Sequence, residues 1–290
     1  MKKITHIFLV LLFRAGMLFG QHQELNEPPK TYKLEEQESE NKKSLLSAFR
    51  QGKVRGHFRY YFLATDNQNP LTDYYANAAG GGIHYETGSY QGFRFGLSGF
   101  YIFNIGSSDL SKPDSLTGQF NRYEIGLFDI EDALNKKDIN RLEEFFLQYQ
   151  YKNLKLLYGR QLMNNPFINL QDGRMRPTVV EGLTMDWALG SSGKLSASWL
   201  YGISPRSTTR WFDMGSSIGV YPTGVNPDGS KSAYKNQLES KGAGLLGIRS
   251  KLGGHLNVQF WDLFVEGIFN SALLQLDYAL PLKSGAQFYA

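Results

Sequence analysis

Apolar and cationic side chains alternate along much of residues 54–63. Phe58 and Phe62 belong to an apolar row, while Arg55 and Arg59 belong to a cationic row between them. Successive side chains of a β-strand point to opposite faces of a sheet. The segment therefore predicts a strand with one apolar face and one cationic face.

The same alternation recurs along the rest of the chain. It predicts strands at residues 53–65, 74–87, 92–104, 142–151, 154–163, 178–189, 194–204, 242–252, 256–262, 271–280 and 285–290. Five connectors between them are tight turns at residues 87–91, 152–154, 190–193, 253–255 and 281–285. Three are long, at residues 104–141, 163–178 and 204–242. Short turns at one end and long loops at the other are typical of outer-membrane barrels. The predicted fold class is therefore all-β, a transmembrane antiparallel β-barrel of the outer-membrane type.

Residues 1–20 have the features of a signal peptide for export. Two lysines follow Met1, residues 7–13 are apolar, and Gly20 offers a small residue for cleavage. An amphipathic first helix is the alternative, but the segment has no polar face and no cap. Residues 21–51 are polar and of mixed charge, which predicts a periplasmic N-terminal extension. Residues 52–290 then form the barrel.

Charge and cysteine content exclude several functions. Residues 1–20 hold three of the 31 basic residues and none of the 27 acidic ones, so the remaining chain is almost neutral. Nucleic-acid binding needs a concentrated basic footprint, and we predict no nucleic-acid partner. The chain has no cysteine, so it has no disulfide and no thiolate metal site. It also has no H-E-x-x-H motif, and we predict neither a metal nor a cofactor.

The polar row of each strand has a defined place in such a barrel. The apolar face must point to lipid, and the polar face lines an aqueous lumen. Arg55, Arg59 and Arg94 are then predicted to lie along the path of a solute, where fixed cations favour anions and carboxylates. The alternative is that these side chains only make the lumen polar.

The connector at residues 163–177 reads MNNPFINLQDGRMRP. Counted from a periplasmic N-terminus, it is the third connector at the loop end, after those at residues 65–74 and 104–141. If it folds inward, it narrows the passage, and Asp172, Arg174 and Arg176 place opposite charges at the constriction. The alternative is a loop that packs on the barrel wall through internal salt bridges.

Several motifs occur in order along the chain. They are Gly80 to Glu86 (GGGIHYE), Gly159 to Gln161 (GRQ), a group with Asp172, Arg174, Met175, Pro177, Glu181 and Gly182, and residues 256–278 (LNVQFWDLFVEGIFNSALLQLDY). With them the chain resembles the outer membrane porin D (OprD) family over nearly everything after Gly52. The resemblance implies an 18-stranded monomeric barrel in a Gram-negative outer membrane. It also implies uptake of small carboxylates, amino acids or short peptides along a ladder of basic residues that includes Arg160.

Ten or eleven strands are fewer than the family's 18, and the chain stops at Ala290 as another strand begins. We therefore expect an incomplete barrel, from a fragment or a truncated product. The expected partners are outer-membrane lipid, small polar or carboxylate solutes, and the barrel assembly machinery during biogenesis.

Two other functions remain as alternatives. An outer-membrane enzyme needs a histidine held beside a nucleophile, and only four histidines follow residue 20, with His57 and His84 inside predicted strands. We therefore predict no enzyme. A non-conducting surface or adhesion barrel is the other alternative, since residues 104–141 and 204–242 could bind a partner.

Overall fold

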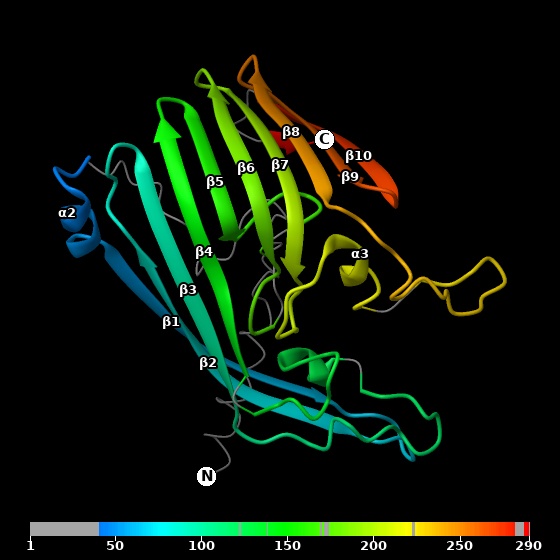
Figure 1. Ribbon diagram of the computed structural model, residues 1–290. Helices are drawn as coiled ribbons and strands as arrows, with labels where there is room; N and C mark the ends of the chain where they lie inside the picture. Colours follow the sequence, from blue (N-terminus) through cyan, green and yellow to red (C-terminus); the bar gives the residue numbers. More distant parts are fainter. Residues whose placement is uncertain are drawn as a thin grey trace, which may run out of the picture.

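The computed structural model describes residues 41–121, 123–137, 139–168, 170, 174–221, 224–281 and 287–289. These residues form a single open sheet in which each strand pairs antiparallel with the next in the chain (Figure 1). The strands are β1 (Lys53–Thr65), β2 (Tyr74–Glu86), β3 (Phe93–Asn104), β4 (Ile139–Tyr151), β5 (Leu154–Gln161), β6 (Val179–Leu189), β7 (Gly193–Ser204), β8 (Ala243–Leu252), β9 (Leu256–Val265), β10 (Phe269–Pro281) and β11 (Gln287–Tyr289). The short helices are α2 (Leu45–Arg50), η2 (Glu124–Leu127) and α3 (Met214–Ser217). The predicted antiparallel all-β class is confirmed, and the predicted signal peptide lies outside the described residues.

The predicted strands agree with the observed ones, and their ends differ by at most three residues. The largest differences are at β4, which begins at Ile139, and at β9, which continues to Val265. The connector between β9 and β10 is therefore only residues 266–268, where Gly267 adopts a φ of 73° and closes the turn. No helix among the described residues is long and apolar enough to cross a membrane.

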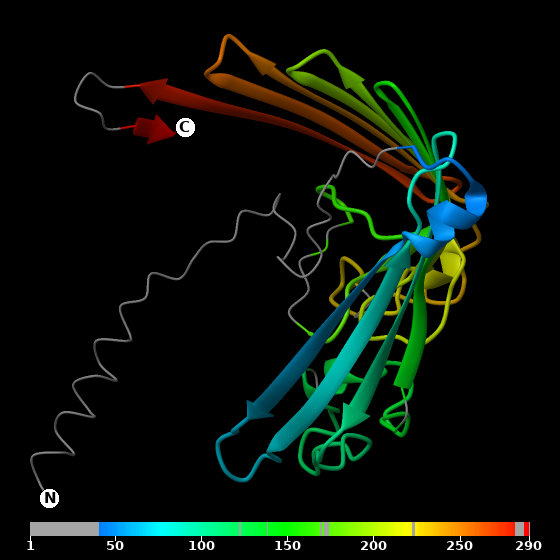
Figure 2. The ribbon, with the colours of Figure 1, turned by 90° about the vertical axis from the view of Figure 1, so that its left-hand side faces the viewer.

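The sheet is curved, and the long connectors fold back on its concave side (Figure 2). Its convex face is apolar and open: Phe58 is 74% exposed, Ile83 67% and Leu274 63%. Polar side chains such as Arg55, Arg94 and Asp186 line the concave face. The apolar and polar rows of the sequence thus correspond to the convex and concave faces of one curved sheet, which we call the wall.

A β-bulge between β3 and β4 changes the alternation within β4. Ser98 is opposite Glu144, whereas Gly99 is opposite Leu142, so Glu143 is an extra residue on β4. Two successive carboxylates, Glu143 and Glu144, are consequently buried on the concave side, while Leu142 stays exposed. Bulges often re-aim side chains in this way.

The hydrophobic core lies between the concave wall and the connectors. One cluster joins β2, β3 and β4 to the connectors and consists of Ala76, Ala78, Phe100, Ile102, Leu110, Leu127, Phe128, Ile139 and Met175. A second joins β6 to β9 with α3 and consists of Val180, Leu200, Met214, Ala243 and Val265. Because both clusters include residues outside the sheet, burial of apolar surface holds these connectors against the wall.

We predict that Gly159→Ala destabilises the fold by about 1–3 kcal/mol. Gly159 has a φ of 117°, and a Cβ there would lie 2.3 Å from the carbonyl oxygen of Phe145. The matched control is Gly56→Ala, where the nearest atom, the carbonyl oxygen of Gly82, is 3.6 Å away. The free energy of unfolding is measured by guanidinium titration of the chain folded in lipid vesicles. Equal unfolding midpoints for the two variants would contradict the prediction.

Candidate functional site

Four strands bring polar side chains together on the concave face. The register aligns Arg55 with His84, His84 with Ser98, and Ser98 with Glu144. The Nδ1 atom of His84 lies 2.8 Å from Oε2 of Glu144, and the Ser98 hydroxyl donates to the same oxygen at 2.9 Å. One buried carboxylate thus joins β2, β3 and β4.

Arg55 and Arg94, two of the predicted path residues, meet at Glu86. An Nη atom of Arg55 lies 3.6 Å from one carboxylate oxygen of Glu86, and an Nη atom of Arg94 lies 3.4 Å from the other. The Arg55 side chain is 44% exposed, so it also faces the open space. Sequence reasoning missed Glu86 as a partner, although its position two residues after His84 places both on the same strand face.

The concave face encloses a hollow of roughly 1270 Å³, lined by residues of β1 to β9. Six basic side chains line it: Arg55, Arg94, Lys152, Lys155, Lys194 and Arg249. Three acidic side chains line it: Glu86, Glu144 and Asp186. Lys194 lies 3.0 Å from Asp186, and the Ser196 hydroxyl donates to Asp186 at 2.6 Å. The lining therefore contains more cations than carboxylates.

Arg59 has a different role from Arg55. Its Nη1 atom donates to the main-chain oxygen of Met175 at 2.8 Å. Met175 is 1% exposed and packs against the inner face of β2, where a Cβ on Gly80 would lie 2.8 Å from its methyl group. Arg59 thus holds the end of the third connector against the wall.

The third connector crosses the concave face of β2 to β4 at residues 174–177. Arg176 is 1% exposed, and its Nη2 donates to the main-chain oxygen of Thr208 at 2.5 Å. The side chain of Arg174 lies against Gly126, whose added Cβ would be 2.4 Å from Nε of Arg174. Asp172, the third predicted constriction residue, lies outside the described residues.

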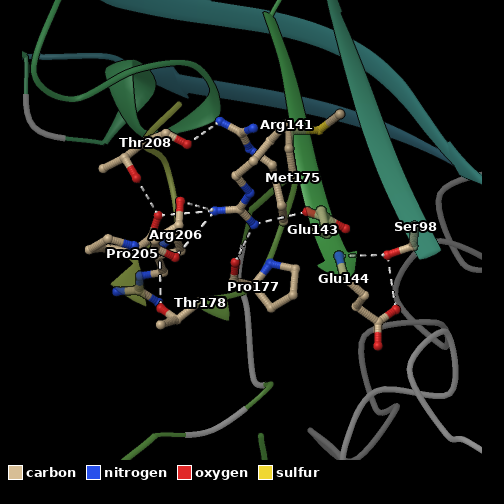
Figure 3. Close-up of polar contacts among 12 residues, drawn as sticks. Ser98, Arg141, Glu143, Glu144, Met175, Pro177, Thr178, Pro205, Arg206 and Thr208 are labelled. Atoms are coloured by element: carbon tan, nitrogen blue, oxygen red, sulfur yellow. Dashed lines mark hydrogen bonds and ion pairs between the residues drawn. The ribbon is translucent and has the colours of Figure 1, made fainter. Parts of the chain in front are cut away.

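Arg141 on β4 joins two connectors to the wall: the third connector, between β5 and β6, and the one after β7 (Figure 3). Together with Arg59 and Arg176 it forms what we call the arginine clamp. No sequence motif indicates Arg141. Its Nη2 donates to Glu143 at 2.8 Å and to the main-chain oxygen of Pro177 at 2.6 Å. Its Nη1 donates to Ser204 and Pro205, with the Ser204 hydroxyl at 3.1 Å. The Arg141 side chain is only 1% exposed. Spacing from Glu143 on the same strand is the only local signal that could have pointed to it.

The structure corrects the prediction that Arg160 lines the lumen. The register places Arg160 opposite Phe145, which is 51% exposed on the convex face. Arg160 donates from Nε to Glu181 at 3.1 Å and lies over the Trp211 ring at 4.4 Å. The reason is simple alternation: Arg160 is two residues from Tyr158, which is 57% exposed on the same face.

No cofactor site follows from these contacts. Within the described part of the chain, no three or more His, Asp or Glu residues lie close enough to hold a metal ion. Arginine, glutamate and serine groups instead hydrogen-bond one another along the wall.

Comparison with solved structures gives matches of low identity and similar fold. OccAB1 of Acinetobacter baumannii matches with a TM-score of 0.61 and 16% identity, over 87% of this chain and 53% of that one. OccK9 of Pseudomonas aeruginosa matches with a TM-score of 0.62 and 17% identity, over 82% and 56%. A BenF-like porin from Pseudomonas fluorescens Pf-5 matches with a TM-score of 0.58 and 13% identity, over 81% and 55%.

The chain has a porin fold. The resemblance that the sequence indicates is thus confirmed for the fold, in the form of an incomplete outer-membrane-type barrel. The chain spans about half the length of these solved porin-fold proteins. No family model matches the sequence, and no curated protein is significantly similar to it.

We predict that Arg141→Met loosens both connectors and costs about 3–5 kcal/mol, because Glu143 is left buried without its cation. Hydrogen exchange should accelerate in peptides that cover residues 174–178 and 205–208. Arg210→Gln is the control, since the side chain of Arg210 is 67% exposed beside Glu131 and such surface pairs contribute about 0–1 kcal/mol.

A double variant separates loss of the clamp from an unpaired charge. Arg141→Met with Glu143→Met removes both partners, so it should be less destabilising than Arg141→Met alone, while exchange at residues 174–178 stays fast. Slow exchange in both variants would show that the connectors are held by other contacts.

Proposed function

We infer that this chain forms the wall of an outer-membrane porin, through which small polar solutes diffuse past the concave face. The observation that carries the proposal is the division of one curved sheet into an exposed apolar face and a charged, hollowed face. Such a division suits lipid on one side and water on the other. A sheet packed inside a water-soluble domain has no need to expose side chains such as Phe58, Ile83 and Leu274.

The lengths of the connectors support an orientation in the membrane. Residues 152–153 and 190–192 form tight turns at one end of the sheet, whereas residues 105–138 and 205–242 leave from the other end. In outer-membrane barrels short turns face the periplasm and long loops face the exterior. The proposed localisation is therefore the outer membrane, with export directed by the predicted signal peptide.

The charge of the hollow supports a preference for anionic solutes. Six basic and three acidic side chains line it, and Lys155 and Arg249 have no carboxylate within ion-pair distance among the described residues. Fixed cations lower the energy of a passing anion. Small carboxylates are thus the favoured solute class, ahead of amino acids and short peptides.

A channel is favoured over an enzyme because the contacts of Ser98 and His84 are not those of a serine nucleophile and its histidine base. Ser98 donates to Glu144, and His84 contacts that same carboxylate rather than the serine. Residues 215–219 match the G-x-S-x-G pattern, but Ser217 ends the short helix α3 and donates to the main-chain oxygen of Met214. The pattern signals a hydrolase only in a turn from strand to helix.

Outer-membrane lipid and the barrel assembly machinery are the proposed partners, and a complete barrel is proposed to be monomeric.

The third connector is proposed to narrow the passage, because residues 174–177 lie over the concave face and are held there by Arg59 and Arg141.

We predict that the protein conducts ions in planar bilayers after it has folded into lipid, in whatever assembly it forms there. The channel should be more permeable to chloride than to potassium. Replacing Arg55 and Arg94 together by Gln should lower the permeability ratio severalfold, on the order of two to five, because Glu86 then lacks its cations. The ratio is obtained from reversal potentials in a salt gradient.

Arg160→Gln is the matched control for the same measurement. It also removes one arginine, but on the convex face, so the permeability ratio should not change. Absence of any conductance would overturn the porin proposal and favour a non-conducting surface barrel. An equal effect of Arg160→Gln would overturn the assignment of the two faces.

A further inference from the structure

A second, smaller pocket lies at the loop end of the sheet, apart from the large hollow. It has a volume of roughly 290 Å³ and shares no lining residue with the hollow. Two connectors form it: the one between β5 and β6 supplies Phe167, Ile168 and Thr178, and the one after β7 supplies Arg206 and Tyr221. Ligand pockets usually start at about 300 Å³, so this one suits a small ligand.

Among the described residues that line this pocket, Arg206 alone carries a charged side chain. Its Nε donates to the Tyr221 hydroxyl at 3.2 Å, and its guanidinium lies 5.3 Å from the centre of the Tyr221 ring. No carboxylate of the described residues lies within ion-pair distance of it, whereas Arg210, four residues later, pairs with Glu131 at 2.7 Å. The two terminal amino groups of Arg206 are therefore available to an external anion.

The rest of the pocket is mainly apolar. Phe167, Ile168, Ile203 and Pro205 supply hydrocarbon surface, and Thr178, Ser217 and Tyr221 supply hydroxyl groups. A cation at one side of an apolar pocket favours a ligand that carries one negative charge on a compact apolar body, since the charge pairs while the body leaves water.

The pocket is held in place by the neighbouring arginine clamp (Figure 3). The main-chain N–H of Arg206 donates to the Thr178 hydroxyl at 3.1 Å, and Arg141 binds the main-chain oxygens of Pro177 and Pro205 on either side. The two connectors that form the pocket are thus fixed relative to each other. Such preorganisation lowers the cost of binding.

We propose that this pocket binds small monocarboxylates with an apolar body, with Arg206 on the carboxylate and Phe167, Ile168 and Ile203 on the body. The site is a docking point at the loop end of the sheet. A solute that enters from this end meets it before it reaches the basic side chains of the hollow. Binding itself is independent of conduction, and only the role as an entry point rests on the proposed porin function.

The test measures binding of 4-fluorobenzoate to the full chain, folded in detergent micelles, by the broadening of its fluorine NMR line. Arg206→Gln should weaken binding about tenfold, because a charge-assisted contact is lost. Ile168→Trp should abolish binding, because the larger side chain fills the apolar part of the pocket while Arg206 stays. Arg210→Gln is the matched control and should bind as the unchanged protein does.

Three competitors define the ligand class. Unlabelled benzoate should displace the probe, while acetate, which lacks the apolar body, and benzyl alcohol, which lacks the charge, should displace it poorly. The proposal would be overturned if Arg206→Gln bound the probe as tightly as the unchanged protein, or if Arg210→Gln lost as much affinity as Arg206→Gln. It would also be overturned if acetate displaced the probe as well as benzoate does. Because no current is measured, a failure here is distinct from the failure of the porin proposal, which appears as absent conductance.

Discussion

The whole architecture depends on the hydrogen-bond register between neighbouring strands. Once two antiparallel strands are paired, residues that face each other share one side of the sheet, and a slip of one residue would exchange the two sides. Exposed apolar side chains such as Phe58 and Leu274 occupy one side, and the charged strand residues that line the hollow occupy the other. Register therefore decides which residues meet, and it brings His84, Ser98 and Glu144 together from three strands.

The fold could be predicted from the sequence because its signal is local. A period of two residues is visible within each strand, and tight turns are visible as glycine, serine and asparagine at 152–154 or 190–193. Alternation also assigns Arg55 and Arg94 to the side opposite Phe58, as the register does. Whether these two arginines line a solute path stays a prediction. For Arg160 the family motif was a poorer guide than alternation. The motif assigned this side chain to the lumen, whereas its spacing of two residues from Tyr158 assigns it to the convex face.

Much of the candidate site could not be predicted, because its contacts join distant parts of the chain. The bulge that buries Glu143 beside Glu144 appears only when β4 is paired with β3. Arg141 reads as one more cation in a polar row, yet its five acceptors come from residues 2 to 64 positions away. No pattern in the sequence indicates those acceptors, since four of the five belong to connectors or to the very end of β7.

The arginine clamp has a consequence for how such connectors can vary. Arg59, Arg141 and Arg176 bind the connectors largely through main-chain oxygens of Met175, Pro177, Pro205 and Thr208. A main-chain oxygen is present whatever side chain the residue carries. The side chains of the connectors can therefore change without releasing the connectors from the wall. In the proposed channel, new solute preferences could thus evolve on an attachment that stays the same.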